Sequence, residues 1–240
     1  MKAFYDLHIH SALSPCAENE MTPNNIVNMA YIKGLDIIAV TDHNSALNCE
    51  AVLRCAKNRG IVAVAGMELE TKEEVHMVCL FPGLEEALKM HDIVDNLLPG
   101  IDNREDIFGQ QIIMDEDDNI VSNYKQMLLT AADLSIDEVF EKVGQLGGVA
   151  VPAHVDRDSY SIISNLGIVP DYLGIKYLEV SKDCMLSQFL NSNPNLSNYK
   201  FLKSSDAHNL EKILERENSL ELEEISIECL IEFLKKQKLK

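Results

Sequence analysis

Short apolar segments alternate with longer segments of helical periodicity along most of the 240-residue chain. The short segments predict strands, at 3–10, 35–43, 61–70, 73–81, 147–154, 176–181 and 199–208. Helices are predicted at 22–34, 45–59, 84–97, 135–146 and 226–240. This alternation predicts an α/β protein with a mainly parallel sheet and helices outside it. About seven strand–helix units favour a barrel over an open sheet.

Local signals support two of these helices. Thr22 is a capping residue, Pro23 suits the first helical position, and Gly34 marks the end of the first helix. The final helix has an apolar stripe that predicts one buried face; it consists of Ile227, Leu230, Ile231 and Leu234.

The acidic segment 99–130 interrupts the alternation, and it includes the stretches DNREDIFGQQ and DEDDN. We interpret it as an insertion or a lid rather than as a second domain. A single α/β barrel is ordinary for a chain of this length. We therefore expect one domain over residues 1–240.

Charge and composition narrow the class of protein. The formal net charge of −18 argues against broad electrostatic binding to long nucleic acid or to an anionic membrane. An anionic substrate is still compatible, because bound cations reverse the local sign. The sequence has no apolar run of membrane-spanning length and no signal-like start. The six cysteines form no CxxC pair, and we expect reduced thiols in a cytoplasmic protein.

Six of the seven histidines fall in predicted strands or at their ends. They are His8, His10, His43, His76, His154 and His208. Glu68 ends the third strand, and Asp206 lies two residues before His208. In α/β barrels the carboxyl ends of the strands form the active-site face, so these side chains are expected to converge there. His91 lies on a predicted helix, and we interpret it as a solvated position.

Each piece has an ordinary explanation when it is taken alone. His8 and His10 can be two surface or hydrogen-bonded histidines, Asp42 and His43 a turn cap with a core histidine, and Glu68 a salt-bridge partner. His76 is the weakest of the six histidines, because its strand can turn it outward. Together they indicate a multinuclear metal site that activates water, since neutral imidazole binds zinc, iron and manganese and carboxylates bridge ions.

The motifs DLHIHS, GLDIIAVTDHN, GMELE, VHMVCLF, GGVAVPAH and SSDAH occur in this order from residue 6 to residue 208. In this combination the chain resembles the polymerase and histidinol phosphatase (PHP) family. The resemblance implies a distorted (β/α)7 barrel, a trinuclear metal site and hydrolysis of phosphate esters. It implies two to three divalent ions, of zinc, iron or manganese.

The resemblance also implies how the ligands divide among the ions. His8, His10, Glu68 and Asp206 would hold the first ion. Glu68 would bridge to a second ion, which His76 and His154 complete. His43 and His208 would hold a third, together with a residue of the loop after the first strand.

In the family that last ligand is usually a His or an Asp, but the matching position here is Cys16. A thiolate ligand would favour zinc or iron over manganese or magnesium. The alternative is that Cys16 is a bystander and that Glu18 or water fills the gap.

The implied reaction is hydrolysis of a phosphate monoester by a metal-bound hydroxide, with a small phosphorylated metabolite or a nucleotide as substrate. Asp42 and Asp6 are candidates to orient a ligand imidazole, although either can be a structural cap. Arg157 is a candidate to bind the phosphate, and the alternative is a surface ion pair with Asp156 or Asp158.

Two other functions stay open at this point. A phosphodiesterase or exonuclease acting on nucleotide ends would use the same site. A metal-dependent amidohydrolase is disfavoured, because such enzymes often use a carbamylated lysine where this chain has Glu68.

Overall fold

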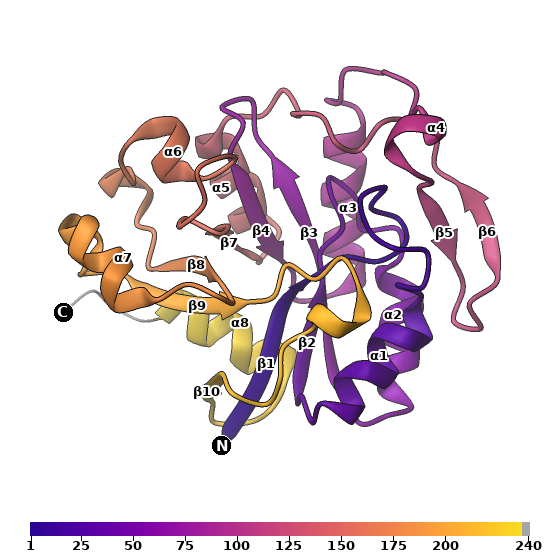
Figure 1. Ribbon diagram of the computed structural model, residues 1–240, viewed down its shortest axis with the longest axis horizontal. Helices are drawn as coiled ribbons and strands as arrows, with labels where there is room; N and C mark the ends of the chain where they lie inside the picture. Colours follow the sequence, from indigo (N-terminus) through magenta and orange to yellow (C-terminus); the bar gives the residue numbers. More distant parts are fainter. Residues whose placement is uncertain (237–240) are drawn as a thin grey trace.

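The computed structural model describes residues 1–236, and positions 237–240 of the expected final helix lie outside the described residues. A six-stranded sheet forms the centre of the fold, in the order β10-β1-β2-β3-β4-β7 (Figure 1). Its strands are β1 (Lys2–Ile9), β2 (Ile37–Val40), β3 (Val62–Glu70), β4 (His76–Leu80), β7 (Val149–Pro152) and β10 (Ser219–Glu221).

The sheet curls into a distorted barrel. Strands β8 (Tyr177–Ser181) and β9 (Lys200–Ser204) form a separate parallel pair. Strand β8 contacts β7, and β9 contacts β1. An isolated bridge between Ile9 and Ala207 joins β1 to the segment after β9. The predicted α/β class and distorted (β/α)7 barrel are confirmed.

The expectation of a mainly parallel sheet is wrong at β4, and β10 also runs antiparallel to β1. Strands β1, β2 and β3 are parallel, but β4 runs antiparallel to both β3 and β7. Only residues 71–75 connect β3 to β4, and a parallel crossover needs a dozen residues or more. Glu74 takes a positive φ of 56° in this turn. The short connection therefore forces β4 to run in the reverse direction.

A bulge in β1 changes which side chains face the barrel interior. Tyr5 pairs with Ile37, whereas Ile9 pairs with Val40, so β1 uses one more residue than β2 over this stretch. Tyr5 and Leu7 pack in the interior core, while Ile9 packs outside against α1 and α2. The extra residue turns the next side chain, His8, inward as well, which is a common use of a bulge beside a functional site.

The main helices cover the outside and one end of the barrel (Figure 1). They are α1 (Pro23–Ile32), α2 (Cys49–Lys57), α3 (Leu84–Asp95), α5 (Ile136–Gln145) and α8 (Ile227–Lys236). As predicted, Thr22 caps α1, since its side chain accepts a hydrogen bond from Asn25 N. The apolar stripe of α8 packs through Leu230, Ile231 and Leu234 onto the interior cluster that contains Leu7.

The structure contains short elements that the sequence did not indicate. They are α4 (Glu105–Phe108), β5 (Ile112–Met114), β6 (Ile120–Asn123), α6 (Ile162–Leu166), α7 (Leu186–Ser192), η1 (Asp171–Leu173), η2 (Pro194–Leu196), η3 (Leu210–Lys212) and β10. Each is too short to show a clear hydrophobic period. Among residues 1–236, no helix is long and apolar enough to cross a membrane.

Segment 99–130 folds into α4 and the β5–β6 hairpin, and it lies against the loop after β1. Ile112 N donates a hydrogen bond of 2.8 Å to Ala12 O. The Asn48 side chain donates to Ile112 O at 3.0 Å. Gly109 has a φ of 95°, and a Cβ there would collide with the Pro15 carbonyl oxygen. The insertion is therefore fixed beside the loop that carries Cys16.

The expectation that His91 is solvated is wrong. The residue is only 6% exposed on α3. Its ring lies 6.1 Å from that of Tyr124, in an edge-to-face arrangement. Tyr124 belongs to the insertion, which folds back over α3. The periodicity of a helix cannot show a contact of this kind, because the covering segment is distant in the sequence.

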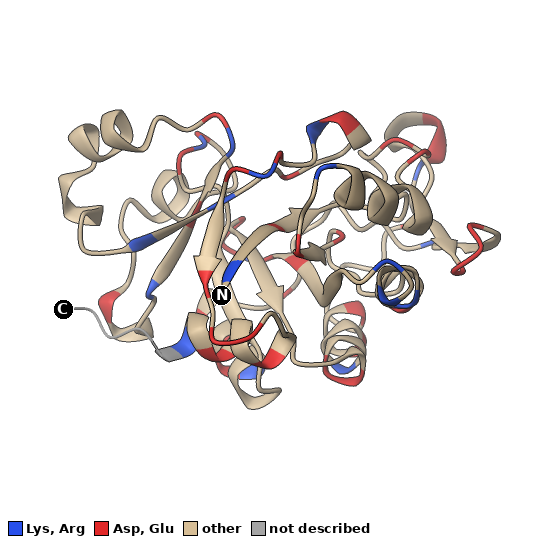
Figure 2. Cartoon of the chain, turned by 90° about the horizontal axis from the view of Figure 1, so that it is seen from below, with Lys and Arg blue, Asp and Glu red and all other residues tan. Residues whose placement is uncertain are grey.

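Charged residues are distributed over the outer elements (Figure 2). In this view from below, acidic residues occur on most helices and loops, and basic residues are scattered among them. The picture agrees with the formal net charge of −18. Positive charge in this view does not gather into one stripe of the kind that tracks a nucleic acid backbone.

Two glycine substitutions test how closely β3 packs against its neighbours. A Cβ at Gly66 in β3 would lie 2.7 Å from Cys79 O and 2.9 Å from Thr41 Cγ2. We expect Gly66→Ala to lower the free energy of unfolding by about 1–3 kcal/mol through overpacking. A Cβ at Gly144 in α5 meets nothing within 4 Å, so Gly144→Ala should raise it by up to about 1 kcal/mol. Urea denaturation measures both, and a similar effect of the two changes would contradict this account of β3.

Candidate metal centre

The predicted ligands other than Cys16 meet at one end of the barrel, and most are buried. His8 lies in β1 and His10 follows it, His43 follows β2, Glu68 lies in β3, His76 begins β4, His154 follows β7, and Asp206 and His208 follow β9. The reversed direction of β4 brings its first residue to the end where the other strands finish. His76, which the sequence predicts inside a strand, is thus the first residue of β4 and lies beside the other candidate ligands.

Hydrogen bonds to residues around the cluster orient His8 and His10. His8 Nδ1 lies 2.9 Å from Glu179 Oε1, and His10 Nδ1 lies 2.9 Å from Ser14 Oγ. Ser14 Oγ in turn donates to Asp42 Oδ1 at 2.7 Å. This network assigns the ring proton of both histidines to Nδ1. Their Nε2 atoms therefore point inward, where they face each other at 3.2 Å.

Glu68 lies at the centre of the cluster. Its Oε1 is 2.9 Å from His76 Nδ1 and 3.1 Å from His154 Nε2. Its Oε2 is 3.0 Å from His43 Nδ1 and 3.3 Å from His10 Nε2. One carboxylate thus contacts imidazoles on two sides, which is the arrangement that a bridging ligand requires.

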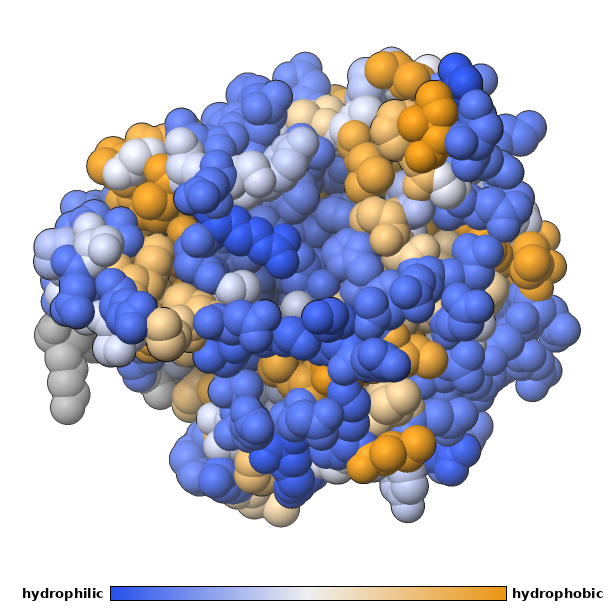
Figure 3. All heavy atoms as spheres, viewed as in Figure 1, coloured by the Kyte–Doolittle hydropathy of each residue, from blue (hydrophilic) through white to orange (hydrophobic). Residues whose placement is uncertain are grey.

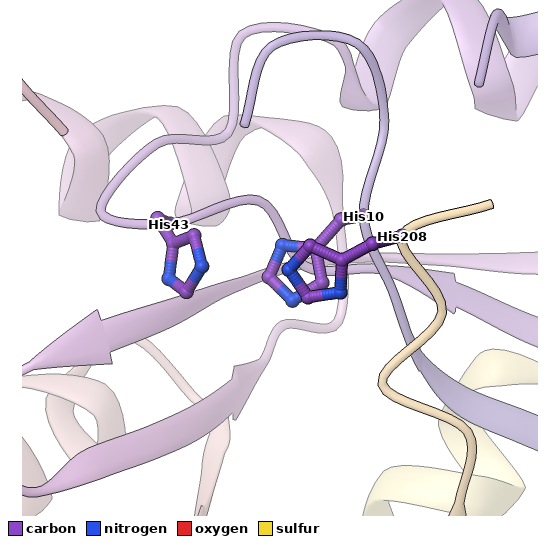
Figure 4. A group of neighbouring side chains, drawn as sticks. All are labelled: His10, His43 and His208. Carbon is purple, nitrogen blue, oxygen red and sulfur yellow. The ribbon is translucent and has the colours of Figure 1, made fainter. Parts of the chain in front are cut away.

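The potential ligand atoms form three overlapping groups. The first combines His8, His10, Glu68 and Asp206, and the second combines His43, Glu68 and His76. The third combines His10, His43 and His208 (Figure 4). In this group the His10 and His208 rings stack with centroids 4.2 Å apart, and the His43 centroid lies 4.5 Å from that of His10 and 6.0 Å from that of His208. The first and third groups share His10, and Glu68 is common to the first two.

His154 lies outside these three groups of described residues, although its Nε2 is 3.1 Å from Glu68 Oε1. Cys16 lies outside them as well. It is exposed at the surface. Although the residue as a whole is exposed, the protein around its sulfur limits hydration of the thiolate and, with the nearby charge of Glu68, raises the pKa of Cys16 to about 12. A free thiol there is therefore protonated at neutral pH. The assignment of Cys16 as a ligand stays a prediction.

Burial and charge compete in setting the pKa values of the imidazoles. Burial acts to lower the pKa of His8, but surrounding carboxylates, first that of Glu179, raise it well above its ordinary value. Burial dominates at His43 and His208 and lowers their pKa to about 3 and about 4. The latter two rings are neutral at pH 7 and have lone pairs available for a cation.

The donor set fits divalent ions of the zinc, iron and manganese class. Imidazole neighbours, first His76, hold the pKa of Glu68 well below its ordinary value although burial opposes this. His154 Nδ1 is buried without a hydrogen-bond partner, and Glu68 Oε2 contacts His43 and His10 without forming a hydrogen bond of good geometry.

Hydrogen bonds to Asp206 and Glu68 raise the pKa of His10 to about 9 although burial opposes this. The Nε2 atoms of His8 and His10 face these two carboxylates, and a bound cation would replace the protons that the carboxylates favour there.

Sequence reasoning missed two residues that orient the ligands. Glu179 holds His8 and also accepts a hydrogen bond from His154 N at 3.2 Å. The only signal for it is a carboxylate between the apolar residues Leu178 and Val180 of a short strand. Ser14 links Asp42 to His10 through two hydrogen bonds, so Asp42 orients a candidate ligand indirectly. Asp6 instead accepts hydrogen bonds from Ser205 N and Leu214 N, as a structural cap does.

Arg157 lies at the rim of the cluster. Its Nη1 is 2.6 Å from Asp206 Oδ2, and 43% of its side chain is exposed. It therefore pairs with a candidate ligand and not with the adjacent Asp156, which accepts a hydrogen bond from Ser181 N. In Figure 3 a hydrophilic hollow lies near the centre of the face, with apolar residues bordering it on the side of α4.

The chain is similar to parts of longer curated proteins. A 5'-3' exoribonuclease of Haemophilus influenzae is 33% identical over 79 residues, which are 32% of this chain and 28% of that protein. An uncharacterised protein of Methanocaldococcus jannaschii is 26% identical over 166 residues, which are 69% of this chain and 18% of that protein. The chain thus spans less than a third of either relative.

Solved structures share the fold over nearly the whole chain. A lesion-specific endonuclease from Pyrococcus furiosus has a TM-score of 0.69 at 21% identity, covering 98% of this chain and 56% of that one. A Bifidobacterium adolescentis protein assigned as a metal-dependent phosphoesterase has a TM-score of 0.60 at 19% identity, covering 89% and 91%. An amidohydrolase from Chromobacterium violaceum has 0.62 at 18%, covering 97% of both chains.

The sequence profile of the PHP domain matches residues 6–180. This range includes the candidate ligands from His8 to His154 and the orienting Glu179, and Asp206 and His208 follow it. The match covers well over half of the chain and agrees with the barrel and the histidine cluster. The chain belongs to the PHP domain family.

Proposed function

We propose that the protein is a metal-dependent phosphoesterase that hydrolyses a phosphate monoester of a small metabolite or a nucleotide. The observation that carries this proposal is the convergence of two inward imidazole nitrogens with the carboxylates of Glu68 and Asp206. The overlapping groups support two to three ions, of zinc, iron or manganese. Bound divalent cations would polarise the phosphoryl group and acidify water.

The protein's own residues would position these ions and the substrate. Glu179 and Ser14 hold the rings of His8 and His10 in place, so the inward nitrogens are pre-organised. Arg157 would leave Asp206 and bind the phosphate through its guanidinium fork. Because the chain has a net charge of −18, this local positive charge matters for an anionic substrate.

A phosphodiesterase or exonuclease acting on nucleotide ends is the second candidate. The similarity to an exoribonuclease over 79 residues favours it. The same groups would serve either reaction, and the scattered positive charge favours a short substrate over a long nucleic acid. An amidohydrolase is a weaker candidate, because a glutamate rather than a lysine occupies the centre of the cluster.

The proposed activity is tested with metal-free protein reloaded with zinc, iron or manganese. We expect release of phosphate from p-nitrophenyl phosphate, histidinol phosphate or nucleoside mono- and bisphosphates, and loss of this activity after chelation. Dinucleotides assayed in parallel distinguish phosphodiesterase activity from phosphomonoesterase activity. Failure of the fully loaded protein to hydrolyse any phosphoester would rule out both candidates.

Glu179→Gln tests how the first group is oriented. The amide is isosteric but cannot accept the His8 proton with the strength of a carboxylate. We expect a loss of about 10- to 100-fold in metal affinity or activity. Metal titration against a competing chelator measures it. Glu141→Gln on the exposed face of α5 is the matched control, and an equal effect of the two substitutions would contradict the orienting role.

Cys16→Ser tests the third group. We propose that an ion held by His43 and His208 draws the Cys16 thiolate into its coordination, because a bound metal deprotonates a nearby thiol. The variant should then retain one ion fewer per chain than the parent protein after dialysis, as measured by elemental analysis. Unchanged stoichiometry would show that Cys16 is a bystander.

A further inference from the structure

Tyr160 stands at the rim of the metal centre in a conformation that tyrosine rarely adopts. Its φ is 53°, within the left-handed region, where a bulky L-residue is strained. The residue belongs to the segment between β7 and α6, which also carries Arg157. Strain that persists in a fold indicates that the surrounding structure determines the residue's position, and such residues gather at ligand-binding sites.

Hydrogen bonds hold this segment in place before and after Tyr160 in the sequence. His76 N donates to Tyr160 O at 2.9 Å. Ser161 Oγ donates to Arg157 O at 2.9 Å, and the Asp156 carboxylate accepts from Ser181 N at 2.8 Å. The segment is therefore tied to β4, to the start of α6 and to β8. Its side chains are held in place before any substrate arrives.

The Tyr160 ring stacks on a candidate ligand, and the residue is partly exposed. It stacks on the His76 ring with centroids 4.7 Å apart and an interplanar angle of 24°. The residue is nevertheless 46% exposed. His76 stacks on one face only, so the exposed surface of Tyr160 is available to a ligand at the rim. The nearby Arg157 supplies a positive charge at the same rim.

We propose that Tyr160 determines substrate specificity by stacking on a planar ring that is attached to the phosphate ester. The favoured substrates are then nucleotides and aryl phosphates rather than sugar phosphates. This inference rests on the proposed phosphoesterase activity and names its substrate class. Stacking of a base on an aromatic side chain is strong enough to change affinity by about tenfold or more. A substrate without a planar ring obtains no such contact.

Adenosine 5'-monophosphate and ribose 5-phosphate form a matched pair for the test, since they differ at C1' by the base. With metal-loaded protein, we expect kcat/KM for the nucleotide to exceed that for the sugar phosphate by about tenfold or more. Tyr160→Asn should lower this ratio about tenfold. Asparagine tolerates a positive φ, so the substitution removes the ring and suits the backbone. Tyr160→Phe should keep the ratio.

The ratio of the two kcat/KM values distinguishes stacking by Tyr160 from a purely structural role of this residue. If Tyr160→Asn slows both substrates equally, the ring only supports His76 and the proposal is wrong. Tyr172→Asn is the control, because Tyr172 on η1 is 76% exposed and its hydroxyl contacts Asp137; its ratio should equal that of the parent protein.

Binding measurements distinguish a failure of the stacking proposal from a failure of the proposed phosphoesterase activity. If the parent protein hydrolyses neither compound, the dissociation constants of both are measured by calorimetry. A preference for the nucleotide that Tyr160→Asn abolishes supports stacking even then. Equal dissociation constants for the two compounds overturn it.

Discussion

The buried carboxylate of Glu68 is the constraint on which the site depends. It lies within 3.3 Å of five imidazoles that come from four different strands or their ends. A carboxylate buried so deeply is strongly destabilising unless positive charge and hydrogen-bond donors surround it. The strands therefore have to deliver their histidines to one point, and a bound cation would satisfy the same requirement.

Two irregularities of the sheet make this convergence possible. The bulge in β1 turns His8 inward directly after Leu7, so an interior apolar residue is followed by a candidate ligand. The antiparallel β4 places its first residue, His76, next to the end of β3. A regular parallel barrel would have left His76 far from the carboxyl ends of its neighbours. Both departures from ideal geometry thus occur where the candidate ligands are.

The rim around the cluster differs in character from its centre. The centre consists of buried imidazoles and carboxylates that orient one another through Glu179 and Ser14. The rim exposes Arg157 and the strained Tyr160, and the insertion docks on the loop that carries Cys16. This division is typical of sites in which a rigid scaffold holds the reactive groups and loops supply the substrate contacts.

The sequence by itself determined the fold class, the main helices and nearly all of the converging residues. It did so because strand periodicity and the position of polar residues at strand ends are local properties that a single chain displays. His8, His10, Glu68 and Asp206 could be found in this way, and so could the buried stripe of α8.

Only the tertiary structure decided the direction of β4, the burial of His91, the contact of Arg157 with Asp206 and the orienting role of Glu179. Each of these depends on a partner that is distant in the sequence or on a turn whose geometry overrides the local pattern. Hydrophobic periodicity shows which face of an element is buried, but it does not show which distant residue covers that face.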